Sequence, residues 1–228
     1  MNQAMKQQTK QAMKPALRID FFHDVICGWC YVLSPRLRQL ATEFDLDIHH
    51  HAFALTATRA DQIDKFGSVE QAKSIIMGHW EQCAKADDAQ RINVAGMRAQ
   101  SFDYPISTPG LVACKAAAQQ PGEKGAQATY WDYFDAITHA HLHENRNIAD
   151  EDVLVAVAEE IGLDGTRFRQ DMADPQRQQE IAQDKALAEA YGVNSTPTLV
   201  INQQWAIPGA VSLVQLREAM TEIQASIQ

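Results

Sequence analysis

The sequence predicts an α/β fold in which a large all-helical insertion separates an N-terminal βαβ unit from a C-terminal ββα unit. A strand-like apolar run, Leu17–Phe22, precedes a helix-like segment, and an alternating segment follows that helix. Residues 59–179 show helical periodicity almost throughout, and a short apolar β-run begins directly after Pro197. These elements indicate a single sheet covered by helices.

The N-terminal unit is defined by changes in the hydrophobic period. Leu17–Phe22 is a short apolar run, and residues 31–44 carry leucines at helical spacing. Residues 45–55 then alternate between two faces, which predicts a second strand. A strand, a helix and a second strand in this order predict an opening βαβ unit.

Turn and capping residues divide the middle of the chain into several short helices. Gly67-Ser68, Tyr104-Pro105 and Pro121-Gly122 interrupt the helical pattern. Ser107–Gly110, with a proline in its first turn, is typical of a helix start, and Gly162 closes a later helix.

The C-terminal unit follows a helix expected over Ala182–Tyr191. The run Thr198–Ile201 begins immediately after Pro197, where a proline removes no central ladder bond. We expect a turn and a hairpin partner over residues 203–207 and a final amphipathic helix over residues 211–223.

Composition indicates a soluble globular chain. Its 228 residues are 46% hydrophobic, which is sufficient for a substantial core. A net charge of -9 without a basic stripe argues against a nucleic-acid partner. No apolar run approaches the ~20 residues that span a bilayer, and the polar N-terminal tail, residues 1–16, lacks the apolar segment of a secretory signal. We therefore expect a cytoplasmic protein with no membrane partner.

The motif Cys27-Gly28-Trp29-Cys30 lies between the first strand and the first helix. A helix that begins at Cys27 directs unpaired N–H groups and the positive end of its dipole at that sulfur, which lowers a thiol pKa. The motif therefore predicts a redox dithiol in which Cys27 is the nucleophile and Cys30 the resolving thiol. Zinc binding and an inert structural disulfide are the alternatives. No second ligand pair at zinc spacing follows, and structural disulfides usually close longer loops, so no metal site is predicted.

Three segments together resemble the DsbA-like thioredoxin superfamily, with the FrnE-type dithiol-disulfide oxidoreductases as the closest match. They are the CGWC motif after a strand, Thr196-Pro197 before another strand, and the segment Ile207–Ala210. The resemblance covers most of the chain from Leu17 to Ile223. It implies a thioredoxin-like domain formed by residues 17–58 and 180–228, with residues 59–179 as a helical insertion domain.

The same resemblance implies how the site works. Pro197 would be cis and lie beside the dithiol, and Thr196 would offer backbone groups to a peptide. The expected partner is a protein or small thiol or disulfide, with glutathione as a candidate substrate. No bound cofactor is expected, because the Cys27–Cys30 pair would itself be oxidised to a disulfide and reduced again. Trp29 is expected at the surface, where it offers apolar area to a substrate or packs against a neighbouring loop.

Three titratable residues near the motif are candidates for a proton relay. Asp20 lies on the first strand, where related folds carry a buried acid, although its register differs by one residue from that pattern. Asp24 and His23 lie closer to Cys27. A hydrogen-bonded strand residue is the alternative for Asp20 and His23, and a turn residue for Asp24.

The remaining cysteines and histidines predict no second site. Cys83 and Cys114 are expected to be buried in helices away from the dithiol. His139 and His143 share a helical face but lack the intervening acid of a metalloprotease motif.

Two other classes of function stay open from the sequence. One is a glutathione-dependent isomerase or transferase, of the kappa or 2-hydroxychromene-2-carboxylate isomerase type, which resembles this chain in scaffold but generally has Ser at the position of Cys27. The other is a redox-independent, chaperone-like module that holds peptides through Trp29 and Thr196-Pro197. The sequence does not define the oligomeric state.

Overall fold

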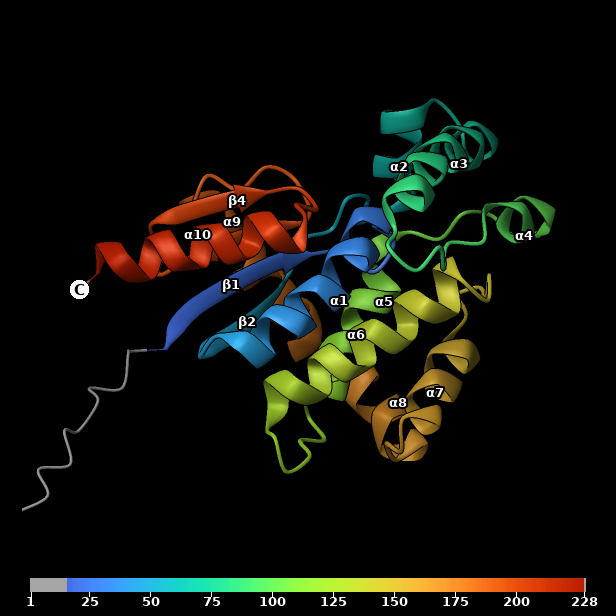
Figure 1. Ribbon diagram of the computed structural model, residues 1–228. Helices are drawn as coiled ribbons and strands as arrows, with labels where there is room; N and C mark the ends of the chain where they lie inside the picture. Colours follow the sequence, from blue (N-terminus) through green and yellow to red (C-terminus); the bar gives the residue numbers. More distant parts are fainter. Residues whose placement is uncertain (1–15, 228) are drawn as a thin grey trace, which may run out of the picture.

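The computed structural model describes residues 16–227, so all but the last residue of the predicted polar tail lies outside it. A four-stranded sheet in the order β2-β1-β3-β4 forms its centre (Figure 1). The parallel pair β1 and β2 and the antiparallel pairs β1–β3 and β3–β4 are those expected for joined βαβ and ββα units. The strands are β1 (Leu17–His23), β2 (Leu46–Ala52), β3 (Thr198–Ile201) and β4 (Trp205–Pro208).

Ten helices surround the sheet in the described part of the chain. Those of the N- and C-terminal units are α1 (Gly28–Glu43), α9 (Gln176–Ala190) and α10 (Leu213–Ser226). The predicted insertion supplies α2 (Arg59–Phe66), α3 (Val69–Ala86), α4 (Val94–Ala99), α5 (Ser107–Ala117), α6 (Ala126–Leu142), α7 (Glu151–Glu160) and α8 (Gly165–Ala173). Within residues 16–227, no helix combines the length and apolar character needed to cross a bilayer.

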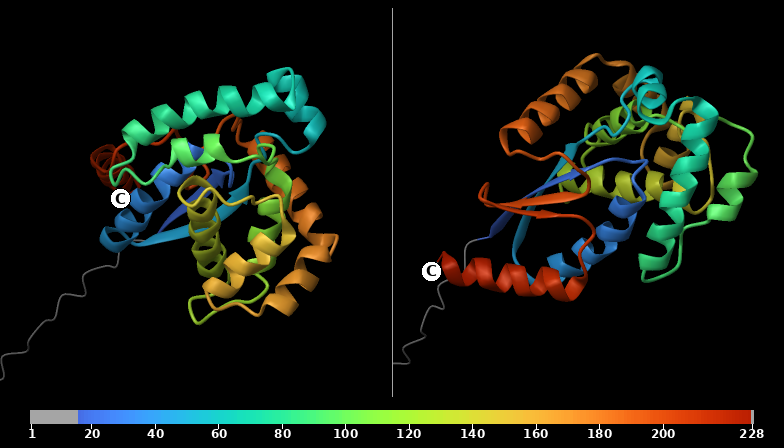
Figure 2. Two further views of the ribbon diagram at one scale, coloured as in Figure 1. Left: turned by 90° about the vertical axis from the view of Figure 1, so that its right-hand side faces the viewer. Right: turned by 90° about the horizontal axis from the view of Figure 1, so that it is seen from above.

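The two faces of the sheet pack against different helices. Viewed from above in Figure 2, α1 and α10 lie on one side of the strands and α9 on the other. Side chains alternate along β1. Phe21 belongs to the large core that includes Leu33 of α1, whereas Phe22 packs with Ala188 and Tyr191 at α9. Odd-numbered residues of β1 therefore face the side of α1, the helix that carries the dithiol, and even-numbered residues face the side of α9.

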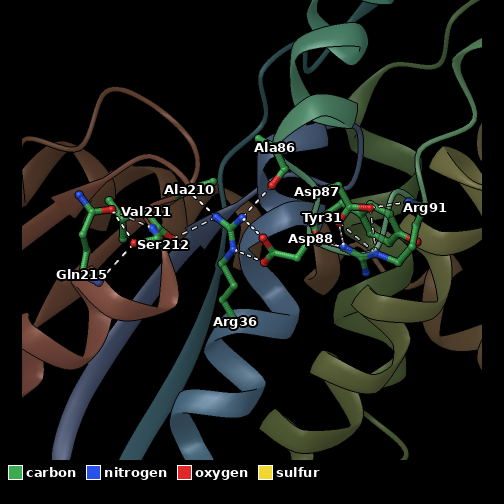
Figure 3. Close-up of polar contacts among 10 residues, drawn as sticks. All are labelled: Tyr31, Arg36, Ala86, Asp87, Asp88, Arg91, Ala210, Val211, Ser212 and Gln215. Atoms are coloured by element: carbon green, nitrogen blue, oxygen red, sulfur yellow. Dashed lines mark hydrogen bonds and ion pairs between the residues drawn. The ribbon is translucent and has the colours of Figure 1, made fainter.

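Two helix boundaries differ from the sequence expectation. The helix expected to begin at Ala182 starts at Gln176, because a polar turn precedes its apolar stripe, with Pro175 at the N-cap. The last helix starts at Leu213 because Ser212 forms a capping box with Gln215, which satisfies amides of the first turn (Figure 3).

Arg36 links α1 to two segments that are distant in the sequence (Figure 3). Its Nη1 donates to the carbonyl oxygens of Ala210 at 2.9 Å and Val211 at 3.2 Å, before α10. Its Nη2 donates to the carbonyl of Ala86, at the end of α3, at 2.7 Å, and its Nε pairs with Asp88 at 2.8 Å. A guanidinium is suited to this role because its donors are fixed in one plane.

Replacing Arg36 with Met should lower the free energy of unfolding by about 2–3 kcal/mol, because carbonyl groups lose charged donors while the aliphatic stem is kept. Urea denaturation followed by circular dichroism measures the change. Arg217→Met is the matched control, because the Arg217–Glu43 ion pair is exposed and should contribute little. Equal losses in both variants would contradict the linking role of Arg36.

Candidate active site

The dithiol lies at the N-terminus of α1, as its position in the sequence predicts. Cys27 is the N-cap residue, and its Sγ accepts a hydrogen bond from the Cys30 amide at 3.3 Å. Both thiols are free, with Cys27 5% exposed and Cys30 fully buried. Of the two sulfurs, Cys27 is thus the one that an incoming substrate can reach.

The loop before β3 brings Thr196 and Pro197 to the dithiol. Pairing of β3 with β1 places Thr198 opposite Phe22, so the preceding residues meet the carboxyl end of β1. The Cys27 thiol donates to the Thr196 carbonyl at 3.8 Å, and the Thr196–Pro197 peptide bond is cis. The Pro197 carbonyl accepts from the Gly209 amide at 2.8 Å.

The environments of the two thiols shift their pKa values in opposite directions. Burial raises the pKa of Cys27, but interactions with the side chains of Cys30 and Thr196 and with the Cys30 amide outweigh it, so the pKa lies below its usual value. Burial and the neighbouring Cys27 sulfur raise the pKa of Cys30 well above its usual value. Cys27 is therefore the thiol of the pair that ionises more readily, and Cys30 the one that holds its proton more tightly.

Asp24 is the acid that the structure brings to the dithiol. It is fully buried, and burial raises its pKa to about 6, although hydrogen bonds from the Leu55 amide and Ser107 oppose the rise. The Leu55 amide donates to Oδ2 at 2.7 Å and the Ser107 hydroxyl donates to the same oxygen at 2.6 Å. Its negative charge acts on both Cys27 and Cys30. Ser107 was missed at the sequence level because it reaches Asp24 from the start of α5.

The structure separates Asp20 from the dithiol. Asp20 projects to the α9 face of β1, where Arg18 donates to it at 2.7 Å and His51 lies at 2.8 Å. The register of Asp20 differs by one residue from the pattern of related folds, and a shift of one residue along a strand moves a side chain to the other face of the sheet. Of the two acids considered for a proton relay, Asp20 thus points away from the dithiol, and only Asp24 lies beside it.

His23 is a buried core residue. Its Nε2 lies 3.3 Å from Nδ1 of His50, and its ring packs against Phe134 of α6 with centroids 4.1 Å apart. Burial and the nearby His50 hold its pKa well below the usual value, so it stays neutral. No contact of His23 with either thiol of the motif is found in the described structure.

A cavity of about 180 Å³ opens beside Cys27 between α1 and the pair α2 and α3. Half-buried Trp29 is one of its lining residues. Its other lining residues include six with large apolar or aromatic side chains and two with basic ones: Ile26, Leu55, Phe66, Ile76, Trp80 and Tyr104, and Lys65 and His79.

Cys83 also lines this cavity, although the sequence placed it away from the dithiol. A Cβ atom added at Gly28 would lie only 2.8 Å from the Cys83 sulfur. The expectation failed because only tertiary packing of α3 against α1 reveals the contact. Cys114 is fully buried in α5, as expected.

Gly28→Ala should destabilise the chain by about 1–3 kcal/mol, because the added methyl group overpacks against Cys83. The double variant Gly28→Ala with Cys83→Ala should recover most of the loss, since it removes the clashing sulfur. Thermal unfolding of the two single variants and the double variant measures the coupling. Additive effects would show that the two side chains do not compete for this space.

The fold and site together define a thioredoxin-fold protein with a dithiol at a helix N-terminus and a helical insertion. A family model described as the DSBA-like thioredoxin domain matches residues 18–221, so the chain belongs to that family. The predicted thioredoxin-like fold with its inserted helices is confirmed.

Individual relatives agree with this assignment. The uncharacterized protein YwbO of Bacillus subtilis is 24% identical over 211 residues, covering 91% of this chain and 98% of YwbO. The cytosolic disulfide reductase DsbM of Pseudomonas aeruginosa superposes with a TM-score of 0.72 at 21% identity, covering 92% of this chain and 100% of DsbM. A 2-hydroxychromene-2-carboxylate isomerase superposes with a TM-score of 0.65 at 17% identity, covering 92% and 99%. At these identities the superpositions show a shared fold.

Proposed function

We propose that this chain is a thiol-disulfide oxidoreductase that exchanges disulfides with protein or small-thiol substrates through Cys27 and Cys30. The observation that carries the proposal is the pairing of two free thiols, one helical turn apart, whose pKa values are shifted in opposite directions. Such a pair separates a nucleophile that is ready to attack from a thiol that acts only after the first step.

In the reducing direction, the Cys27 thiolate attacks one sulfur of a substrate disulfide, and the other substrate sulfur leaves as a thiolate. The resulting mixed disulfide is then attacked at the Cys27 sulfur by Cys30. The second substrate thiolate leaves and the Cys27–Cys30 disulfide forms, so the protein loses the two electrons that the substrate gains. In the oxidising direction the same steps run in reverse.

Asp24 is the residue that we assign to proton transfer at Cys30. A buried thiol with a raised pKa must lose its proton before it attacks, and Asp24 is a buried base whose charge acts on that thiol. A pKa of about 6 leaves Asp24 largely ionised at neutral pH and therefore able to accept the proton. Ser107 holds the carboxylate in place through its 2.6 Å hydrogen bond.

The substrate side of the site is formed by Trp29, Thr196 and Pro197 around the exposed part of Cys27. Trp29 offers apolar surface, and the loop at Thr196 offers backbone groups within reach of the attacking sulfur. A structure of DsbM with GSH shares this fold over 92% of the present chain, which supports glutathione as a small-thiol substrate or reductant. We also propose that the chain belongs to the FrnE-type subgroup and that it acts in a reducing cytosol.

Turnover of a disulfide-bonded peptide by glutathione, with and without the protein, tests this function. We expect the protein to accelerate reduction, and Cys30→Ser to lose most of that acceleration, because the mixed disulfide on Cys27 has lost its principal resolving thiol. If glutathione-dependent isomerase chemistry were the main activity, Cys30→Ser would retain it, because that chemistry needs no second thiol. Failure of the wild-type chain to accelerate exchange in either direction would overturn the proposal.

A further inference from the structure

Cys83 places a third thiol at the N-terminal turn of α1. It lies on α3, is 2% exposed, and lines the same cavity as Cys27. Its sulfur occupies the space in front of Gly28, the residue that directly follows Cys27, where a Cβ would be 2.8 Å away. The absence of a side chain at Gly28 is thus what allows this sulfur to approach the dithiol.

His79 supplies a base in the same cavity. It precedes Cys83 by one helical turn on α3, so the two side chains share a face, and both line the cavity with Cys27. Burial, and then the negative charge of Cys27, raise the pKa of Cys83 to about 12, so this thiol is protonated at rest. The exposed imidazole of His79, one helical turn away on the same face of α3, can receive that proton when the thiol reacts.

We propose that Cys83 is a second resolving thiol, which closes a disulfide with Cys27 when a mixed disulfide is not resolved by Cys30. This inference rests on the proposed function, because Cys27 must first have formed a mixed disulfide. It gives the cavity a protective role, since a substrate or glutathione held on Cys27 is released even when Cys30 is blocked or oxidised.

The reaction is balanced within the protein and its substrate. Cys83 gives its proton to His79, and its thiolate attacks the Cys27 sulfur of the mixed disulfide. The bond between Cys27 and the substrate sulfur breaks, the Cys27–Cys83 bond forms, and the substrate leaves as a thiolate that takes up a proton. Two protein thiols are oxidised, and the original substrate disulfide is reduced to two thiols. Once Cys30 is again a free thiol, it can displace Cys83 from Cys27 without net oxidation.

The test uses the full chain with Cys30→Ser, so that resolution by Cys30 is removed. The reduced variant is exposed to glutathione disulfide, excess reagent is removed, and the intact mass is followed with time. We expect a single glutathione adduct on Cys27 that is lost roughly 10-fold or more faster than from Cys30→Ser with Cys83→Ser, since attack within one cavity has a high effective concentration. Digestion without reductant should yield a Cys27–Cys83 linked peptide pair.

Two further variants make the outcome specific to Cys83. Cys30→Ser with Cys114→Ser, which removes a buried thiol outside the cavity, should behave like Cys30→Ser alone. Cys30→Ser with Cys83→Ala repeats the comparison without a hydroxyl group in the cavity. Equal persistence of the adduct with and without Cys83 would overturn this inference but leave the proposed function intact, because Cys27 has reacted. Absence of any adduct on Cys27 would overturn both.

Discussion

Replacing Cys27 with Ser is expected to reduce disulfide exchange to the uncatalysed background. A hydroxyl group is not ionised at neutral pH and cannot form the mixed disulfide, so the first covalent step is lost whatever Cys30 does. Reduction of a disulfide-bonded peptide by glutathione, measured at equal protein concentrations, checks the result. The same change should leave any peptide-holding activity in place, which separates the oxidoreductase from the chaperone-like alternative.

The matched control for Cys27→Ser is Cys114→Ser, because Cys114 is buried and lies outside the cavity beside the dithiol. In the folded wild-type chain, iodoacetamide should label Cys27 faster than Cys83 or Cys114, whose pKa values are raised by burial. Substantial exchange by Cys27→Ser, or equal labelling of the three thiols, would contradict an activated Cys27.

Replacing Asp24 with Asn is expected to slow resolution of the mixed disulfide by about 100-fold at neutral pH, because Cys30 loses its proton acceptor. In the wild-type chain the resolution rate should rise with pH through about 6, where Asp24 ionises, and then level off. The variant should lack this rise. Rapid-quench measurement of a single turnover, started from the reduced protein and one equivalent of disulfide, isolates the step.

Asp20→Asn is the control for this experiment, since Asp20 lies on the opposite face of β1 and is held by Arg18 and His51. It should keep the rise near pH 6. The assignment of proton transfer to Asp24 would be wrong if the Asp24 variant kept the inflection, or if the Asp20 variant lost it.

Local periodicity was sufficient to predict most of the fold. The strands β1 and β3, the hairpin partner β4 and the helix start at Ser107 are each defined by short apolar patterns and by a turn or cap residue. The start of α9 at Gln176 was missed because its first turn is polar, and periodicity carries no signal there. The dithiol was predictable because a strand, two spaced cysteines and a helix are all local features.

The rest of the site depends on contacts between distant segments. Asp20 and Asp24 are similar candidates by type and spacing. Only the side-chain alternation of β1, together with the contacts of Ser107 and Leu55, shows which of the two lies beside the dithiol. Cys83 is likewise an ordinary helical cysteine in the sequence. Its position near the dithiol results from the packing of α3 against Gly28, and no local sequence pattern predicts that contact.

The most direct test of the central claim is a redox titration of the Cys27–Cys30 pair. The protein is equilibrated with glutathione buffers of graded composition, quenched with an alkylating reagent, and its free thiols are counted by mass. We predict one reversible two-electron transition confined to Cys27 and Cys30, with a midpoint toward about -270 mV for a reductant or about -120 mV for an oxidant. If the pair forms no intramolecular disulfide at any buffer composition, dithiol chemistry at this site is contradicted.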